Sequence, residues 1–378
     1  MKILFINLPY YGHVIPTIGL VKELRRLGAE VTYMLPFDWE ERVAESGAIF
    51  YGYENNKQLS EQMKNAYKAA AEIIEQFDLI IYEQFFFLGK HLAEEYKKPV
   101  VRIFTAPATN KRLMTEFITA KGPLSIFKHK WITKAFTKDI VKEASKRIVL
   151  KTDNWLDEIV ENPPELNLVY ALREFQPYVE EFKDEQYVFL GPSIYERQGD
   201  TFDYVKGQRP LVYISLGTIL KGAVSFFQDC VEAFREEDVD VIISVGNRFR
   251  KEKLKRLPEN VHIYSSVPQL EVLQMADVFI THGGMNSVSE ALSYGTPMVV
   301  IPFVSDQPVN ARCVEKLGVG RKLEYSSINK KTLKDTVFSV IMDEEIKENI
   351  NKVKMLIKAA PGNKGGAERI IEYYRRAK

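Results

Sequence analysis

The chain has 378 residues, of which 46% are hydrophobic and 27% charged, a composition typical of a globular protein. This length exceeds that of one ordinary domain and predicts two domains, each large enough to bury its own core. The formal net charge of +1 indicates no general attraction to nucleic acid, and we expect no nucleic-acid partner.

The N-terminal segment superficially resembles a signal peptide, but its apolar run ends at Asn7 and no small-residue cleavage site follows, so a first buried strand is expected. Cys230 and Cys313 lie far apart without C-x-x-C spacing, so neither a disulfide framework nor a zinc site is predicted. No stretch approaches the roughly 18 uncharged apolar residues of a membrane span. These features predict a cytoplasmic protein whose cysteines are reduced and buried.

In the first part of the chain, short apolar runs alternate with amphipathic segments. Strands are predicted over residues 3–8, 30–35, 48–51, 78–82 and 99–104. Helices are predicted over residues 14–27, 57–77 and 85–96. Continuous apolar strands joined by helical crossovers indicate a parallel sheet that is covered on both faces.

Residues 107–151 interrupt this alternation with a helical, aromatic and basic segment that holds eleven Lys or Arg residues against three Asp or Glu. It could form solvated helices with one packed apolar stripe. It could also bind an acceptor substrate, or form a surface that meets an acidic partner or a membrane. Periodicity does not distinguish these alternatives.

A polar stretch rich in Gly and Pro ends this part of the chain, and residues 196–210 are predicted to be a linker. A second alternating series follows, with strands over 211–216, 239–245, 260–266, 277–281 and 297–302. We therefore predict two Rossmann-like doubly wound α/β domains, residues 1–195 and 211–378, with the last helix free to pack back on the first domain. Domains of this kind usually bind ligands in a cleft that they face.

The segment 267–311 carries the strongest functional signal. A strand is followed by a tight turn at His282, Gly283 and Gly284, and a helix then begins near Asn286. Glycines let a ligand approach the backbone, and the free amides of a helix N-terminus favour an anion. The turn is therefore predicted to bind a phosphate or diphosphate, and a carboxylate one turn into the helix, Glu290, could accept hydrogen bonds from ribose hydroxyls.

Together with the residues Ser-Leu-Gly-Thr at 215–218, this segment resembles the donor-binding signature of UDP-glycosyltransferases with the GT-B fold, especially the bacterial macrolide-type members. The resemblance implies an inverting, metal-independent transfer of a hexose, glucose foremost, from a UDP-sugar to a hydroxyl of a small aromatic or macrolide-like acceptor. Met285 stands where plant members carry Trp. The implied donor-binding residues are Gly12, Thr218, Val267, Gln269, His282, Gly283, Gly284, Asn286, Ser287, Glu290, Asp306 and Gln307.

Within this resemblance Val267 and Gln269 would hold the uracil and Glu290 the ribose. Asp306 and Gln307 would bind hydroxyls of the sugar. Without the resemblance, Asp306 and Gln307 could simply cap a helix, and Glu290 could be an exposed helix residue.

His13 follows the first strand, where Gly12 lets the backbone turn and Pro16 suits the first turn of a helix. This places His13 at the carboxyl edge of the sheet, where the resemblance implies a general base. The family has an Asp at the end of the fourth strand to orient this histidine. Glu83 occupies the matching position and carries one extra methylene. A helix-capping carboxylate is the alternative.

The acceptor is not determined by the sequence. Phe85 and Phe86 are candidates for an apolar acceptor pocket, with a buried aromatic cluster as the alternative. Asp238 and Asp240 form an Asp-x-Asp pair, but they begin a buried strand at the wrong edge of the sheet, and no metal ligand is predicted.

Three other functions remain to be weighed. A glycolipid or cell-envelope sugar transferase that acts at the membrane surface would suit the basic segment 107–151, although membrane association is not the favoured expectation. A non-catalytic nucleotide-sugar-binding protein would need the donor motif without the base. An NAD(P) oxidoreductase is disfavoured because no G-x-G-x-x-G follows the first strand.

Overall fold

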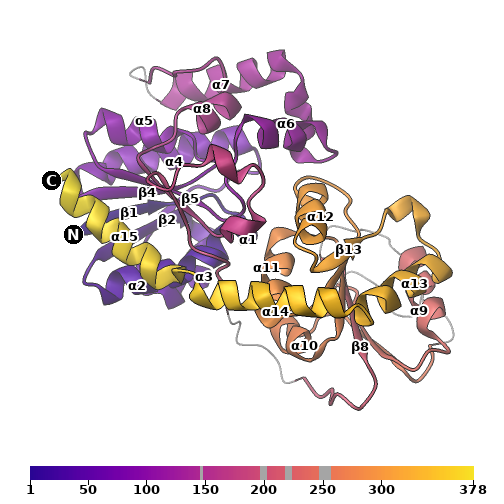
Figure 1. Ribbon diagram of the computed structural model, residues 1–378. Helices are drawn as coiled ribbons and strands as arrows, with labels where there is room; N and C mark the ends of the chain where they lie inside the picture. The colour runs from indigo at the N-terminus through magenta and orange to yellow at the C-terminus, as the bar shows by residue number, and fades with distance from the viewer. Residues whose placement is uncertain (145–147, 196–201, 218–223, 247–256) are drawn as a thin grey trace. The chain divides into compact units, whose positions relative to one another are not determined.

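The computed structural model describes residues 1–144, 148–195, 202–217, 224–246 and 257–378. The chain divides into two compact units, one formed by Met1–Tyr195 with Ala360–Lys378 and the other by Glu196–Ala359. Each unit contains one parallel β-sheet with helices on both faces (Figure 1). The prediction of two Rossmann-like doubly wound domains is confirmed.

The sheet of the first unit has the strand order β3-β2-β1-β4-β5-β6-β7, with every pair parallel. Its strands are β1 (Lys2–Ile6), β2 (Glu30–Pro36), β3 (Ile49–Tyr53), β4 (Leu79–Glu83), β5 (Val100–Phe104), β6 (Leu166–Val169) and β7 (Tyr187–Phe189). The order reverses between β1 and β4. The loops after these two strands therefore diverge, and ligands bind at such a switch point in open α/β sheets.

The helices described in this unit, apart from short 3-10 turns, are α1 (Tyr11–Val14), α2 (Ile18–Arg26), α3 (Glu40–Val43), α4 (Leu59–Ile73), α5 (Leu88–Glu95), α6 (Lys111–Thr119), α7 (Lys130–Ala144), α8 (Trp155–Glu161) and α15 (Gly362–Ala377). Successive residues of β1 alternate between two cores, as a strand covered on both faces requires. Leu4 and Ile6 pack with α4, α5 and α8, whereas Ile3 and Phe5 pack with α2 and α15. The last helix thus belongs to the first unit, where it lies against α2.

The helix predicted over residues 14–27 is interrupted. The helical backbone begins at Tyr11, and the 3-10 turn η1 (Ile15–Thr17) separates α1 from α2. Pro16 lies in this turn and has no N–H to donate, so it cannot continue an α-helical ladder through that point. The earlier start brings His13 onto a rigid helical turn.

The basic segment contains α6, the 3-10 helix η5 (Pro123–Lys128) and α7, and its residues 145–147 lie outside the described part. Lys64 of α4 is almost fully buried and fastens α7 to the rest of the unit. Its ammonium lies 2.7 Å from Asp139 and 3.6 Å from Glu143 of α7, and 2.9 Å from Glu61. Both acidic side chains of α7 therefore contact α4, although each stays about half exposed.

The sheet of the second unit has the order β10-β9-β8-β11-β12-β13, again all parallel. Its strands are β8 (Leu211–Ser215), β9 (Asp240–Ser244), β10 (Val261–Tyr264), β11 (Val278–Thr281), β12 (Met298–Val300) and β13 (Gly320–Lys322). Its described α-helices are α9 (Val224–Phe234), α10 (Gln269–Met275), α11 (Met285–Tyr294), α12 (Gln307–Lys316), α13 (Lys330–Ile341) and α14 (Glu344–Ala359). The switch point lies between β8 and β11. Among the described residues, no helix is both long and apolar enough to cross a lipid bilayer.

Candidate active site

The switch point of each sheet carries residues that the sequence analysis singled out. In the first unit His13 follows β1 and Glu83 ends β4. In the second unit Gly217 follows β8 and His282 follows β11. Parallel pairing of β1 with β4, and of β8 with β11, brings each pair of strand ends to one edge of its sheet.

The backbone of His13 is fixed by Asn7, which is fully buried just beyond β1. The Asn7 side-chain amide donates to the His13 carbonyl oxygen at 3.0 Å and to the Tyr33 hydroxyl at 2.9 Å. The Tyr33 hydroxyl also lies 2.6 Å from the Thr17 hydroxyl, at the end of η1. This buried network joins β1, β2 and the turn that carries His13, and sequence reasoning had not identified it.

His13 and Glu83 form a pair in which the glutamate is buried and the histidine is partly exposed. The imidazole Nδ1 lies 3.0 Å from Glu83 Oε1, with the histidine side chain 24% exposed and the glutamate side chain 0% exposed. The contact is close, but its geometry is that of a polar contact and not of an aligned hydrogen bond. Glu83 Oε2 accepts a hydrogen bond from the Phe85 amide at 3.0 Å, which fixes the carboxylate. Nδ1 is the ring nitrogen that faces Glu83, and Nε2 is the one directed away from that carboxylate.

Aromatic rings surround the imidazole. The ring of Tyr10 lies 5.3 Å and that of Phe85 5.6 Å from it, centroid to centroid, and Phe85 in turn lies 6.5 Å from Trp155. Burial, and then the charge of Glu83, raises the pKa of Tyr10, so that side chain stays neutral. Phe86 is fully buried in the core with α4 and α5, as the alternative of a buried aromatic cluster expects, and a role for it in acceptor binding stays a prediction.

In the second unit the His282 imidazole is held between two glycines. A side chain at Gly217 would place its Cβ 2.8 Å from His282 Cε1, and one at Gly284 would place it 2.5 Å from Nε2. Gly217 also has φ of +64°, a conformation that favours glycine. Gly217 of the Ser-Leu-Gly-Thr motif thus leaves room for the His282 ring, a role that the sequence analysis did not assign to it. Thr218 of the same motif lies outside the described residues.

The turn after β11 leads directly into α11, whose N-cap is Gly284. No side chain caps this end, so the first amides of the helix are available to an anion. Gly283 has φ of +82° and packs against Val300, where a Cβ would lie 2.6 Å from a methyl carbon. Asn286 and Ser287 are half-buried in the first turn. The arrangement can hold a phosphate or diphosphate.

Burial lowers the pKa of His282 from the usual 6.5 to about 4, so the ring is neutral at pH 7 and can donate one hydrogen bond without bringing a charge. A histidine with a depressed folded-state pKa takes up a proton on unfolding between pH 6.5 and 4, so the folded state loses stability as the pH falls through this window. Between pH 6.5 and 4 this histidine should lower the free energy of unfolding by up to about 3 kcal/mol, and His282→Asn should abolish that decrease. Urea denaturation at several pH values gives the slope of the unfolding free energy against pH. The exposed His129→Asn is the control. An unchanged slope in His282→Asn would contradict the expectation.

Residues predicted for the nucleoside form a hydrogen-bonded chain. The Tyr213 hydroxyl donates to Gln269 Oε1 at 3.0 Å, and Gln269 Nε2 donates to Glu290 and, at 3.4 Å, to the Ser287 hydroxyl. Glu290 is nearly buried in α11, and Val267 is half-buried just before α10. Tyr213, stacked on Phe279 at 4.8 Å, is a positioning residue that sequence reasoning missed because it lies inside a buried strand.

We expect Tyr213→Phe to weaken UDP binding about 3- to 10-fold, because loss of one buried hydrogen bond frees the Gln269 amide that aligns Glu290. Isothermal titration calorimetry with UDP measures the change. Tyr204→Phe is the matched control, since its hydroxyl bonds to Asp240 at the amino end of β9 in the same unit. Equal UDP affinities for the two variants would show that the chain does not position the site.

The predicted sugar-binding pair lies at the start of α12. Gln307 is buried, and its side-chain oxygen accepts hydrogen bonds from the amides of Phe303 and Val304 at 2.8 and 3.1 Å, so this oxygen fastens the preceding loop. Asp306 is half-buried and accepts from Asn310 Nδ2 at 2.8 Å, and the same Asn310 amide donates to the Gly283 carbonyl at 2.9 Å. Asn310 therefore ties the pair to the glycine turn.

The two aspartates of the Asp-x-Asp pair contact other side chains, away from His282. Asp238 lies 2.8 Å from Arg209, and Asp240 accepts from the Tyr204 hydroxyl at 3.1 Å. Both are at the amino end of β9, the opposite edge of the sheet from His282. Within the part of the chain that the structure describes, no cluster of three or more His, Cys, Asp or Glu side chains could hold a metal ion.

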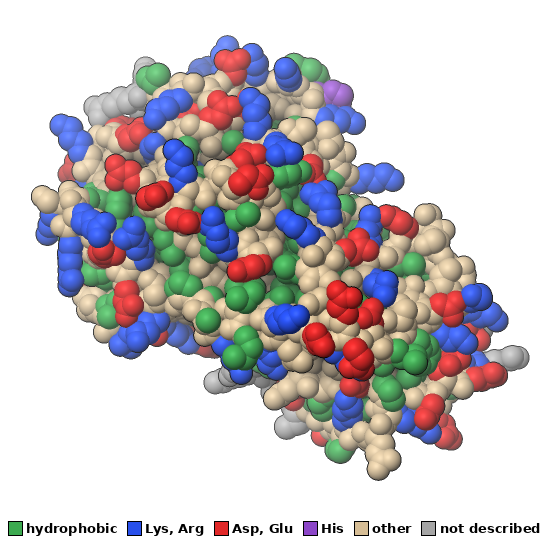
Figure 2. Space-filling view, in the orientation of Figure 1, with side chains coloured by type: hydrophobic (Ala, Val, Ile, Leu, Met, Phe, Trp, Pro, Cys, Tyr) green, Lys and Arg blue, Asp and Glu red, His purple; other side chains and the backbone are tan. Residues whose placement is uncertain are grey.

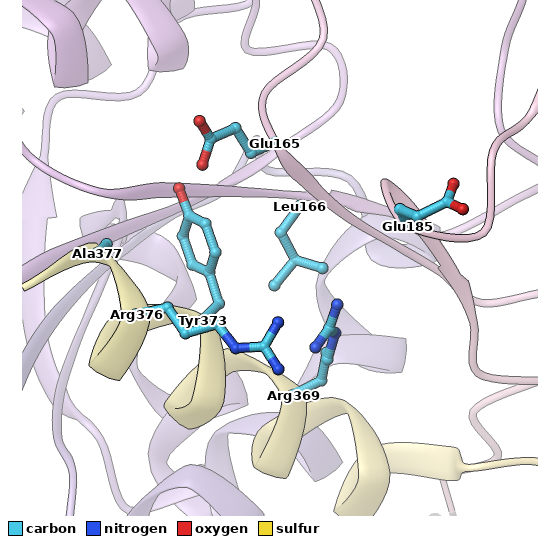
Figure 3. Close-up of a pocket in the computed structure, with 7 residues that line it drawn as sticks. All are labelled: Glu165, Leu166, Glu185, Arg369, Tyr373, Arg376 and Ala377. Atoms are coloured by element: carbon cyan, nitrogen blue, oxygen red, sulfur yellow. The ribbon is translucent and has the colours of Figure 1, made fainter.

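A separate cavity of about 230 Å³ lies in the first unit against α15 (Figure 3). It is lined by Glu165, Leu166, Glu185, Arg369, Tyr373, Arg376 and Ala377. Leu166 is the first residue of β6, so the cavity is at the amino edge of the sheet, away from His13. Figure 3 shows the Tyr373 hydroxyl directed toward Glu165, and Arg369 and Arg376 both pair with Glu372. It holds none of the predicted site residues.

Comparison with known proteins is consistent with this arrangement. Residues 197–364 match the family model of UDP-glucoronosyl and UDP-glucosyl transferases. The uncharacterized UDP-glucosyltransferase YojK of Bacillus subtilis is 32% identical over 98% of this chain and 97% of its own. The NDP-glycosyltransferase YjiC of the same organism is 34% identical over 96% of this chain and 94% of its own.

Solved structures give the same result. The calicheamicin glycosyltransferase CalG4 superposes with a TM-score of 0.84 and 26% identity over 99% of this chain and 98% of its own. The glycosyltransferase of kitacinnamycin superposes with a TM-score of 0.79 and 26% identity over 98% of each chain. With relatives above 30% identity along nearly its whole length, the chain belongs to the UDP-glucoronosyl and UDP-glucosyl transferase family and is a glycosyltransferase with the GT-B fold.

Proposed function

We propose that the protein is an inverting glycosyltransferase that moves a hexose, glucose foremost, from a UDP-sugar to a hydroxyl of a small acceptor. The observation that carries this proposal is the chemistry at the two switch points: an imidazole backed by a buried carboxylate in one unit, and an uncapped helix N-terminus beside a neutral imidazole in the other. The names of the relatives support a nucleotide-sugar donor and a small acceptor of the calicheamicin kind.

On the acceptor side, His13 is the general base. Its Nε2 removes the proton from the acceptor hydroxyl while that oxygen attacks the anomeric carbon of the donor. Glu83, which faces Nδ1 at 3.0 Å, stabilises the imidazolium that forms and fixes the ring orientation. The rings of Tyr10 and Phe85 provide apolar contact for an aromatic or macrolide-like acceptor.

On the donor side, the new glycosidic bond forms as the bond between the anomeric carbon and the diphosphate oxygen breaks, and UDP leaves with the bonding pair. The amides of the first turn of α11, with His282, Asn286 and Ser287, stabilise the negative charge of the departing diphosphate. Glu290 accepts from the ribose hydroxyls, and Asp306 with the Gln307 amide contacts the sugar. One displacement at the anomeric carbon inverts its configuration.

We propose that no metal ion takes part in this step. The N-terminus of α11 and the neutral hydrogen-bond donors beside it would stabilise the negative charge of the diphosphate. The one Asp-x-Asp pair is engaged with Arg209 and Tyr204 at the other edge of the sheet.

A donor-by-acceptor screen read by mass spectrometry tests the proposed function. The screen pairs each of four donors with phenolic, flavonoid and macrolide acceptors; the donors are UDP-glucose, UDP-galactose, UDP-N-acetylglucosamine and dTDP-glucose. Each reaction is run with and without EDTA in large excess over trace metal. We expect the mass gain of one hexose with UDP-glucose, unchanged by the chelator, and a product whose anomeric configuration is opposite to that of the donor.

Two outcomes would contradict the proposal in different ways. UDP binding without transfer to any acceptor would favour a non-catalytic nucleotide-sugar-binding protein. Transfer that stops in EDTA and returns with Mg²⁺ or Mn²⁺ would overturn the metal-independent step while keeping the transferase assignment.

A further inference from the structure

A basic and partly apolar surface covers η5 and the outer side of α7 in the first unit. It consists of Lys121, Ile126, Lys128, Lys130, Trp131 and Lys138, which we call the α7 surface. Figure 2 shows many Lys and Arg side chains, with apolar and some acidic ones among them, over the part of the first unit where α7 lies in Figure 1. None of these residues belongs to the site described above.

The charge on this surface is of one sign. Residues 121–138 contain five lysines and no aspartate or glutamate. Lys134 pairs with Asp153 at 2.8 Å, while the remaining four lysines form no ion pair with any residue that the structure describes. The acidic residues that follow on α7, Asp139 and Glu143, both lie near the buried Lys64 ammonium, at 2.7 and 3.6 Å, although their side chains are about half exposed. The two carboxylates of α7 thus have a cationic partner in Lys64, whereas the lysines of residues 121–138 other than Lys134 have no carboxylate partner among the described residues.

The apolar members of the surface are not needed for packing. Phe127 is buried and Phe136 packs against the same core, so the inner side of this segment is already complete. Trp131 is nevertheless 72% exposed and Ile126 is 54% exposed. The exposed indole leaves a large apolar area in contact with water. Contact with another surface would bury this area and gain the corresponding free energy.

We propose that the α7 surface binds the face of an anionic phospholipid bilayer. Tryptophan favours the depth of the headgroups, where its ring is apolar and its N–H remains hydrogen-bonded. Lysines around it are attracted to anionic headgroups over about one Debye length, roughly 8–10 Å at physiological salt. An anionic bilayer presents spread negative charge at its surface and an apolar interior beneath it. The unpaired lysines suit the surface charge, and the exposed Trp131 suits the boundary with the interior. The contact needs no sugar transfer, so it stands or falls separately from the proposed function.

The intrinsic fluorescence of the protein reports this contact directly. Of the three tryptophans, Trp39 and Trp155 are buried, at 5% and 0% exposure, so Trp131 is the one that solvent reaches. Vesicles of equal parts phosphatidylglycerol and phosphatidylcholine are expected to shift the emission to shorter wavelength and to protect it from acrylamide. Vesicles of phosphatidylcholine alone should not, and about 0.5 M NaCl should reverse the shift by screening. Trp131→Phe should lose the shift.

Vesicle co-sedimentation with matched variants separates the two components. Lys128→Gln/Lys130→Gln/Lys138→Gln is expected to lower partitioning into anionic vesicles about tenfold or more, and Ile126→Ala/Trp131→Ala to lower it further. The control Lys331→Gln/Lys347→Gln/Lys352→Gln removes the same charge from exposed lysines of the other unit and should bind as the parent does. All positions are exposed, so melting temperatures should be unchanged.

The proposal is overturned if anionic vesicles neither bind the parent protein nor shift its emission. Equal loss of binding in the α7 variants and in the control would also overturn it, because binding would then follow net charge alone. So would binding that is equal on neutral and anionic vesicles.

Discussion

Replacing His13 with asparagine is expected to lower kcat by about 10²- to 10⁴-fold, the range over which a positioned general base accelerates proton transfer. The physical reason is that asparagine cannot take up the acceptor proton, so the attacking oxygen must lose it to water. UDP affinity should not change, because the residues proposed to bind the diphosphate and the nucleoside lie in the second unit. Steady-state kinetics with the best pair from the donor-by-acceptor screen, together with calorimetric titration of UDP, gives both quantities.

The side chain of His13 is partly exposed and Asn7 holds its backbone, so the variant should fold. His129→Asn serves as the activity control, since His129 is exposed at the end of η5. A His13→Asn enzyme that keeps the parent kcat would remove the base from the mechanism.

Glu83→Gln is expected to reduce kcat by about 10²- to 10⁴-fold, the cost of losing the carboxylate that orients and charges a catalytic histidine. The neutral amide no longer favours a protonated imidazole. The acid limb of the pH profile of kcat/KM should therefore move to lower pH, a change that a merely structural carboxylate would not produce. Glu83→Asp, which restores the shorter side chain typical of the family, should recover most of the activity.

The first unit offers a matched control for this substitution. Glu158 is another buried carboxylate that contacts a histidine, at 2.9 Å from His91 Nε2. Burial alone would raise its pKa, but hydrogen bonds from His91, Asn162 and Thr152 hold that pKa at about 2. Glu158→Gln should lower the unfolding free energy by roughly 1–3 kcal/mol without moving the pH profile. If both variants shift the profile alike, Glu83 is not specific to the base.

The fold was predictable because it depends on local patterns. Continuous apolar runs such as residues 78–82 and 277–281, each followed by an amphipathic segment, are sufficient to predict parallel strands with crossovers, and the structure confirms them. The same pattern places whatever follows a strand at the carboxyl edge of its sheet. Among the residues at these edges, the resemblance to GT-B glycosyltransferases is what singles out His13, Glu83 and His282.

The remaining details depend on contacts between residues distant in sequence. Tyr213 reaches Gln269 across 56 positions, and Gly217 faces the His282 ring, so neither partner carries a local signal. Phe86 is fully buried, whereas the adjacent Phe85 is only partly buried and lies beside the His13 ring, a difference that composition cannot show. The side-chain oxygen of Gln307 is used by the loop before it, a bond that a motif match does not reveal.

A crystal structure with UDP is the most direct test of the central proposal that the turn after β11 binds the diphosphate. We expect phosphate oxygens about 3 Å from the amides at the start of α11, with His282 beside them and Glu290 accepting hydrogen bonds from the ribose hydroxyls. A diphosphate bound away from this helix N-terminus, or a site left empty at saturating UDP, would contradict the proposal.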